Sequence, residues 1–130
     1  MIHAGDFVGI AALEEIESFG VPVHAVYGNV DEAAVRERLP AELEIEIAGV
    51  RVGLVHDAGP AAGRTARLRR RFGDASCAIF GHTHLPEHAR EGQFQAFNPG
   101  SPTERRRAPS RSMGVLEIDR GIPRFRHVAL

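Results

Sequence analysis

Two histidines one residue apart, His82 and His84, are the strongest chemical signal in the sequence. They follow Gly81 and the apolar run Cys77–Phe80, which predicts a short buried strand. A strand that ends in this way presents two imidazole groups at one edge of a sheet, and imidazole is the commonest metal ligand among side chains. The pair therefore indicates a metal site.

Three further donors close apolar runs in the same way. Asp6 follows Gly5, Asn29 follows Gly28, and His56 follows residues 52–55. Donors at positions 6, 29, 56 and 82 are 23, 27 and 26 residues apart, about one strand plus one crossover connection. Each fragment alone is typical of a turn or of a packed histidine. All four in this order favour convergence on one sheet edge and a shared metal.

The types of these donors indicate the chemistry. The Asp6 carboxylate can bridge two ions, Asn29 offers a neutral oxygen, and the three histidines offer nitrogen. Mixed oxygen and nitrogen ligands without thiolates suit Mn²⁺, Fe or Zn²⁺ in a catalytic site, not a structural zinc site. Two divalent ions about 3.5–4 Å apart can share a hydroxide and clamp a phosphoryl group. Phosphoester hydrolysis is therefore the reaction that this set can perform.

The composition indicates one globular domain over residues 1–130. Apolar residues make up 43% of the chain and charged residues 25%, and no apolar run approaches the roughly 20 residues that span a bilayer. The single cysteine, Cys77, excludes an internal disulfide, which suggests a cytoplasmic protein. Because Cys77 lies in the predicted buried strand, we expect a small core residue and not a nucleophile.

Hydrophobic patterning predicts an α/β domain. The first half alternates strands with helices, and Asp31 is expected to cap the second helix. The second half contains two hairpins. The predicted helices span residues 7–19, 31–39 and 60–72, the strands span 2–5, 22–27, 42–47, 50–55 and 77–80, and the hairpins span 88–97 and 112–128.

Charge excludes a general attraction to nucleic acid, because the net charge is -1. All 16 basic residues are arginines, and two triplets occupy residues 69–71 and 105–107. We favour solvated surface for both triplets, with anion attraction near a phosphate site as the alternative. A nucleic-acid binder is disfavoured, since only 6% of residues are aromatic and tryptophan is absent.

These motifs resemble the calcineurin-like metallophosphoesterase superfamily, in particular its small prokaryotic phosphodiesterase branch. The matching segments are Gly5-Asp6, Gly28-Asn29-Val30-Asp31, His56, Gly81-His82-Thr83-His84 and Asn98-Pro99-Gly100-Ser101. The resemblance implies a two-sheet α/β sandwich, the four-layer metallophosphoesterase fold, with a dinuclear site between the sheet edges. It also implies hydrolysis of small phosphodiesters by a metal-bound hydroxide. Manganese is the favoured metal, with iron, zinc or nickel as alternatives.

The resemblance also implies individual roles. Asp6 matches the bridging aspartate, and His84 matches a ligand of the second metal. The remaining ligands of the first metal match Asn29, His56 and His82. Catalytic roles fall to Asn29, Asp31 and His82, with Asp31 orienting Asn29 or a water molecule. The phosphoprotein phosphatases carry a histidine where this chain has Val30, so no proton donor is expected there.

The sequence departs from the family pattern before Asp6, where no Asp-x-His motif occurs. We therefore expect the first strand and first helix to be missing, one well-formed metal site and one weak site. A misplaced start or a trimmed chain is the favoured explanation, and a short natural paralogue is the other. Asp57 also stands where this branch has glycine, so its carboxylate is expected to repel an anionic substrate or to face solvent.

Partners follow from the same resemblance. A small phosphoester is the expected substrate, no membrane is expected as partner, and the uncovered strand leaves homo-oligomerisation open. The alternative function is a catalytically impaired scaffold or interaction protein of the same fold, similar to the retromer subunit.

Overall fold

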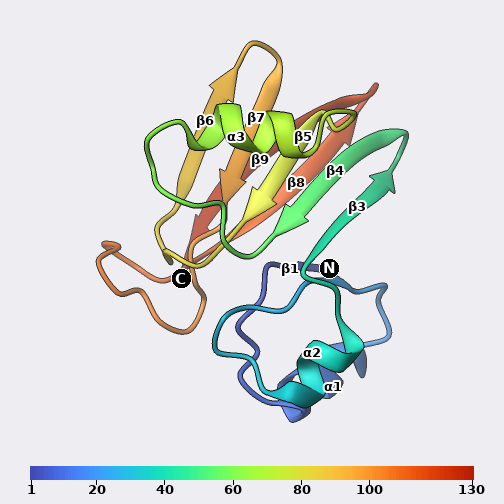
Figure 1. Cartoon of the computed structure of the whole chain (residues 1–130), viewed down its shortest axis with the longest axis vertical. Coiled ribbons are helices and arrows are strands. Elements are labelled where there is room, and N and C mark those ends of the chain that lie inside the picture. The colour runs from blue at the N-terminus through green and yellow to red at the C-terminus, as the bar shows by residue number, and fades with distance from the viewer.

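The structure, a computed structural model, describes residues 1–130, and a five-stranded mixed sheet lies at its centre (Figure 1). The order is β3-β4-β5-β7-β6, in which β4, β5 and β7 are parallel and the two edge strands are antiparallel. The strands are β3 Glu42–Ile47, β4 Val50–Val55, β5 Cys77–Phe80, β6 Glu87–Glu91 and β7 Phe94–Asn98. Both hairpins of this sheet, β3–β4 and β6–β7, confirm the sequence patterning.

Side chains alternate across a strand, and the side chains on both faces of β5 are buried. Ala78 and Phe80 face the helix α3 (Arg64–Arg71) and pack in one cluster with Leu68 and Phe72. Figure 1 shows α3 lying across this face of the sheet. Gly53 on β4 has no room for a side chain, since a Cβ atom would lie 2.4 Å from the Phe72 ring. This glycine therefore allows α3 to approach the sheet.

The opposite face is covered by a two-stranded hairpin and a short parallel pair. The hairpin is β8 (Ser112–Asp119) with β9 (Ile122–Ala129), and the pair is β1 (Ile2–His3) with β2 (His24–Ala25). Cys77 lies in this second cluster with no exposed surface, and burial raises the pKa of its thiol to about 12. Cys77 is therefore the inert core residue that the sequence predicted.

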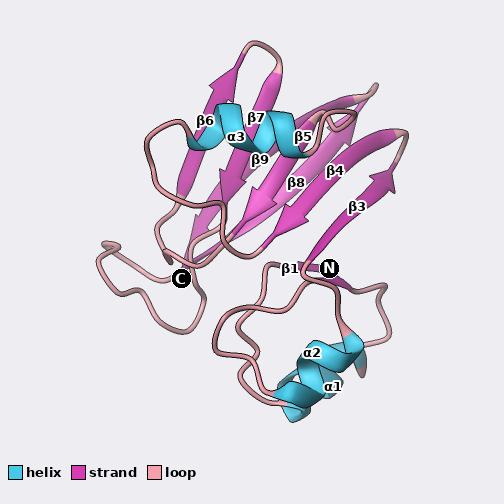
Figure 2. Ribbon diagram, viewed as in Figure 1, coloured by secondary structure: helices cyan, strands magenta, loops and turns pink.

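Helices α1 (Ile10–Glu17) and α2 (Ala33–Arg38) form the outermost layer, against the β1–β2 pair. Leu13 and Val35 pack on Ala25, while the neighbouring Val26 faces the five-stranded sheet. Figure 2 shows the resulting arrangement of helices and strands. The large sheet therefore carries α3 on one face and the two strand pairs on the other, and α1 and α2 pack on the β1–β2 pair. The predicted α/β sandwich is therefore confirmed.

Element boundaries differ from the predictions near the loops. All three helices are shorter than predicted, and α1 begins late because Asp6 and Val8 adopt left-handed backbone angles of 63° and 72°. The prediction that Asp31 caps α2 is wrong, because the N-cap residue is Glu32 and no side chain caps this helix. The Asp31 carboxylate instead accepts backbone N–H groups of Asp6 and Val8.

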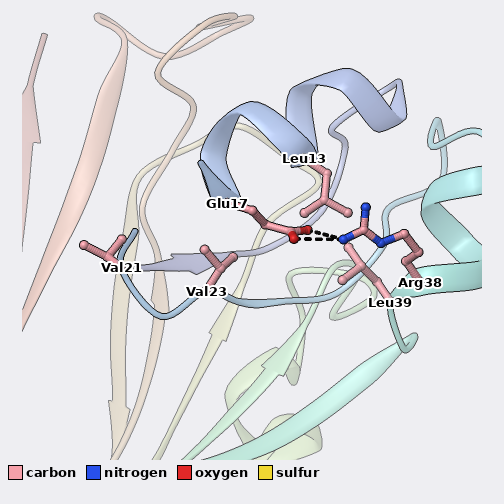
Figure 3. Close-up of a pocket in the computed structure, with 6 residues that line it drawn as sticks. All are labelled: Leu13, Glu17, Val21, Val23, Arg38 and Leu39. Carbon is pink, nitrogen blue, oxygen red and sulfur yellow. Dashed lines mark hydrogen bonds and ion pairs between the residues drawn. The ribbon is translucent and has the colours of Figure 1, made fainter. Parts of the chain in front are cut away.

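A shallow hollow of about 360 Å³ lies between α1 and α2 (Figure 3). Its polar part is the ion pair between Glu17 and Arg38, whose closest atoms are 2.7 Å apart. The remaining lining residues are Leu13, Val21, Val23 and Leu39. None of them is a predicted site residue. None of the three helices is long and apolar enough to cross a lipid bilayer.

The β1 residue His3 is held as a neutral base. Its ring stacks on Phe7 at 3.8 Å between centroids, and its Nδ1 accepts the Gly5 N–H at 3.2 Å. Burial lowers the pKa of His3 to about 4, although the carboxylates of Asp31 and Asp6 oppose this shift. As the pH falls, the unfolded chain protonates His3 near pH 6.5, before the folded protein does. The His3 contribution to the free energy of unfolding is therefore fully present above about pH 6.5 and is lost as the pH drops towards 4.

Replacing His3 with asparagine should remove this component, since an asparagine oxygen can accept the Gly5 N–H without titrating. Between pH 7 and pH 4 the wild type should lose on the order of 1–3 kcal/mol more unfolding free energy than His3→Asn. Urea unfolding of the metal-free proteins, followed by circular dichroism, measures the difference. Parallel pH profiles for the two proteins would show that His3 is not buried in its neutral form.

Candidate metal centre

Parallel pairing brings the histidine segments together at one edge of the large sheet. Val55 on β4 pairs with Phe80 on β5, and the Gly81 N–H continues the ladder by donating to the His56 carbonyl at 2.9 Å. His56 and His82 therefore leave neighbouring strands at the same level. The parallel β1–β2 pair aligns the loop of Asp6 with that of Asn29 in the same way.

The Nε2 atom of His56 is the central atom of the site. It lies 2.9 Å from Asn29 Oδ1, 3.3 Å from Asp6 Oδ2 and 3.3 Å from His82 Nδ1. Asn29 Oδ1 is also 3.1 Å from His82 Nδ1. We refer to these four side chains as the ligand cluster. The structure thus brings together four of the five predicted metal ligands.

A backbone carbonyl fixes the tautomer of His56. Its Nδ1 lies 2.6 Å from the Ala4 carbonyl oxygen, which can only accept, so Nδ1 carries the hydrogen. In the neutral ring, Nε2 then presents a lone pair to the oxygens of Asn29 and Asp6. Lone pairs that face one another repel unless a cation lies between them.

The donor set fits one divalent ion. Two donors each about 2.1 Å from one ion lie about 3.0–3.4 Å apart, which matches the spacing within the cluster. No three histidine, cysteine, aspartate or glutamate side chains form such a group by themselves. The Asn29 oxygen, which contacts both imidazoles, completes the set.

The cluster depends on close approach of two backbone segments. A Cβ atom on Gly28 would lie 2.1 Å from Asp6 Oδ1, and one on Gly5 would lie 2.7 Å from His56 Nδ1. Gly5 also has a φ of 98°, which side chains rarely tolerate. These glycines, which the sequence places beside Asp6 and Asn29, therefore allow the two loops to meet.

Three predicted ligands have strained backbone conformations. Asp6, His82 and His84 adopt φ angles of 63°, 69° and 62°, in the left-handed region that disfavours side chains. Such strain persists only where surrounding contacts impose it, and it concentrates at functional sites. The strain is thus independent evidence that these loops are shaped for something other than stability.

Asp31 lies beneath the cluster, 6% exposed, and supports the strained loop. Its Oδ2 accepts the N–H groups of Asp6 and Gly28 at 3.0 and 2.6 Å, and its Oδ1 accepts that of Val8 at 2.6 Å. Both oxygens are therefore engaged with backbone groups. These contacts lead to the Asp6 loop, not to the Asn29 side chain, and the catalytic role expected for Asp31 stays a prediction.

His84 forms no hydrogen bond or ion pair with the ligand cluster. Its Nδ1 donates to the Glu104 carbonyl at 2.8 Å, and its side chain is 14% exposed. A second metal ligand role for His84 therefore also stays a prediction, and the geometry favours a single ion.

Asn98 is a supporting residue that the sequence offered without a role. It ends β7, is fully buried, and donates through Nδ2 to the Gly81 carbonyl and to Thr83 Oγ1, both at 3.1 Å. Its position after the apolar run of β7 is the signal that could have identified it. The Ala4 carbonyl has no such signal, because every residue carries one.

Two other predicted positions lie at the surface. Val30 is 50% exposed, and Asp57 is exposed with its Oδ1 accepting the Gly59 N–H at 2.8 Å. Asp57 therefore forms a turn facing solvent. Of the arginine triplets, the one in α3 is surface, since Arg69 and Arg71 pair with Glu91 and Glu42.

Comparison with known proteins shows which family the chain belongs to. The model of the calcineurin-like phosphoesterase superfamily domain matches residues 1–121. A probable metallophosphoesterase of Methanothermobacter thermautotrophicus is 38% identical over 122 residues, which are 92% of this chain and 69% of that protein.

Solved structures agree. A Thermotoga maritima protein solved by NMR has a TM-score of 0.75 at 33% identity, covering 99% of this chain and 79% of that one. The zinc complex of wild-type Vps29 from Entamoeba histolytica has a TM-score of 0.75 at 25% identity, covering 98% and 80%. The resemblance that the sequence motifs suggested is confirmed, and the chain belongs to the calcineurin-like phosphoesterase superfamily.

Proposed function

We propose that this protein is a divalent-metal-dependent phosphoesterase that hydrolyses small phosphodiesters. The observation that carries the proposal is the position of His56 Nε2, which lies within 3.3 Å of two oxygens and a second imidazole nitrogen. A divalent ion bound there supplies Lewis-acid polarisation of a phosphoryl oxygen and activation of water at neutral pH. The relative named a probable metallophosphoesterase supports this class of reaction.

Some residues of the site are buried and would hold the metal ion, and others are exposed and face solvent. Asp6 and His56 have side chains only 12% and 7% exposed, so they lie in a poorly solvated environment that strengthens electrostatic interactions. Asn29 and Val30 are exposed and form the solvent side of the cluster. A small phosphoester can therefore reach the ligand cluster from solvent, and we propose such a molecule as the partner of a cytoplasmic enzyme.

Asp31 is best assigned as a positioning residue. Three N–H groups from two segments meet its carboxylate, and these bonds hold Asp6 in its left-handed conformation. A carboxylate that accepts several N–H groups forms strong charge-assisted bonds. Asp31 thus acts on the reaction through the position of Asp6.

Manganese is the metal that we propose, because mixed carboxylate, amide and imidazole ligands suit it. Zinc is the main alternative, since the Entamoeba Vps29 of the same fold was solved as a zinc complex. One well-formed site is expected, because His84 stands apart from the other four donors.

The second candidate is an impaired scaffold or interaction protein. Its support is the similarity to Vps29, a protein named for vacuolar protein sorting and not for hydrolysis. Retention of the four side chains of the ligand cluster favours the enzyme. Activity measurements on the purified protein distinguish the two functions.

Metal analysis should find closer to one ion than two per chain. His82→Ala should weaken manganese binding at least about 10-fold, because losing one ligand interaction costs more than about 1.4 kcal/mol. His84→Ala should leave the tight site unchanged. Isothermal titration and elemental analysis measure both quantities, and two tightly bound ions in the wild type would contradict the single-site geometry.

The proposed activity is tested with bis(p-nitrophenyl) phosphate and Mn²⁺. The wild type should release p-nitrophenol, and His82→Ala should reduce kcat/KM at least about 100-fold, as expected for loss of transition-state stabilisation of about 2.7 kcal/mol. His88→Ala is the matched control, because this exposed histidine bonds only Gln95. Absence of turnover in a metal-loaded wild type, over a panel of metals, would favour the scaffold.

Asp31→Asn tests the positioning role, because it keeps the shape but turns one acceptor into a donor. Losing bonds to a charged group should lower stability by about 1.5–3 kcal/mol and weaken metal binding. Asp57→Asn removes a carboxylate that also accepts a backbone N–H, next to His56 but outside the cluster. A Kd for manganese that changes equally in both variants, at a temperature where both are folded, would count against positioning by Asp31.

A further inference from the structure

The loop between β7 and β8 is fastened to the turn that carries His82 and His84. Besides the two bonds from Asn98, the Glu104 carbonyl accepts a hydrogen bond from His84 Nδ1 at 2.8 Å. Arg106 Nη1 donates to the His82 carbonyl at 3.0 Å. The two triplets of arginine in the sequence thus have different environments, and in the second triplet Arg106 contacts the turn that carries His82.

Arg106 is the member of this triplet whose guanidinium contacts the backbone of His82. Its backbone is left-handed, with a φ of 46°, so the loop holds it in a disfavoured conformation. Arg105 is directed back into the loop, where its Nη1 donates to the Ala108 carbonyl at 2.8 Å. Arg107 is exposed and forms no hydrogen bond or ion pair.

The donors of Arg106 are mostly free. Only Nη1 is used, and the nearest carboxylate oxygen, Glu104 Oε2, is 3.9 Å from Nε. The side chain is 43% exposed. Arg36 on the Asn29 side makes a contrast, because it donates to the Asn29 and Asp31 carbonyls and lies over the Tyr27 ring. Arg36 holds backbone, whereas Arg106 has donors available for a ligand.

We propose that Arg106 binds the phosphoryl group of the substrate through its free N–H groups, next to the ligand cluster. This inference rests on the proposed phosphoesterase function and adds a substrate-binding residue to it. A planar guanidinium matches the oxygens of a phosphate in a two-point contact, which lysine does not reproduce. The bond to the His82 carbonyl holds the guanidinium against the backbone of a predicted metal ligand.

The test compares Arg106→Ala, Arg106→Lys and Arg107→Ala in the full chain loaded with Mn²⁺. The probes are phenylphosphonate, which is not hydrolysed, and bis(p-nitrophenyl) phosphate. Arg106→Ala should raise the phenylphosphonate Kd and the KM about 10- to 100-fold, the range for losing a hydrogen bond to a charged group. Arg106→Lys should recover part of this loss, while Arg107→Ala should match the wild type.

Metal affinity, measured first, separates the possible failures. If all variants bind manganese as the wild type does and Arg106→Ala binds phenylphosphonate unchanged, the role of Arg106 is overturned while the proposed function stands. An equal loss in Arg107→Ala would also overturn it, because a general field and not a contact would explain the binding. A metal-loaded wild type that neither binds phenylphosphonate nor turns over the diester overturns the proposed function as well.

Discussion

The site depends on the hydrogen bond between His56 Nδ1 and the Ala4 carbonyl. This bond places a ring hydrogen on Nδ1 and turns Nε2 towards the oxygens of Asn29 and Asp6. A metal-ligating histidine characteristically donates its other N–H in this way, which fixes the ring and raises its basicity. The arrangement of Nε2 and the two oxygens therefore suits a bound cation.

The surrounding fold positions the segments that carry these side chains. Three parallel strands end at one level and so deliver backbone segments from distant parts of the chain to one edge. The Asp31 carboxylate and the Asn98 amide then hold the two strained turns through bonds to backbone atoms. Rigid strands set the approximate position, and buried polar side chains set the final geometry. Sites built on regular elements reach higher precision in this way.

Sequence patterning predicted the sheets and the convergence of donors, since alternation and apolar runs report burial directly. It failed where long-range geometry decides. Asp31 has the local signature of a helix cap, yet two of its three partners, Asp6 and Val8, lie 25 and 23 residues away. The two arginine triplets are identical in sequence, yet Arg69 pairs with Glu91 on a solvated face while Arg106 contacts His82. Local pattern cannot separate these outcomes.

The buried thiol of Cys77 gives the molecule an internal reporter. It is the only cysteine, it has no exposed surface, and it begins the same strand that leads into Gly81 and His82. Alkylation of this sulfur requires the central sheet to open, so its labelling rate counts opening events. A cation that joins the far ends of β4 and β5 would clamp these two strands together and slow that labelling. The labelling rate of Cys77 in the core would thereby report whether a cation is bound at the sheet edge.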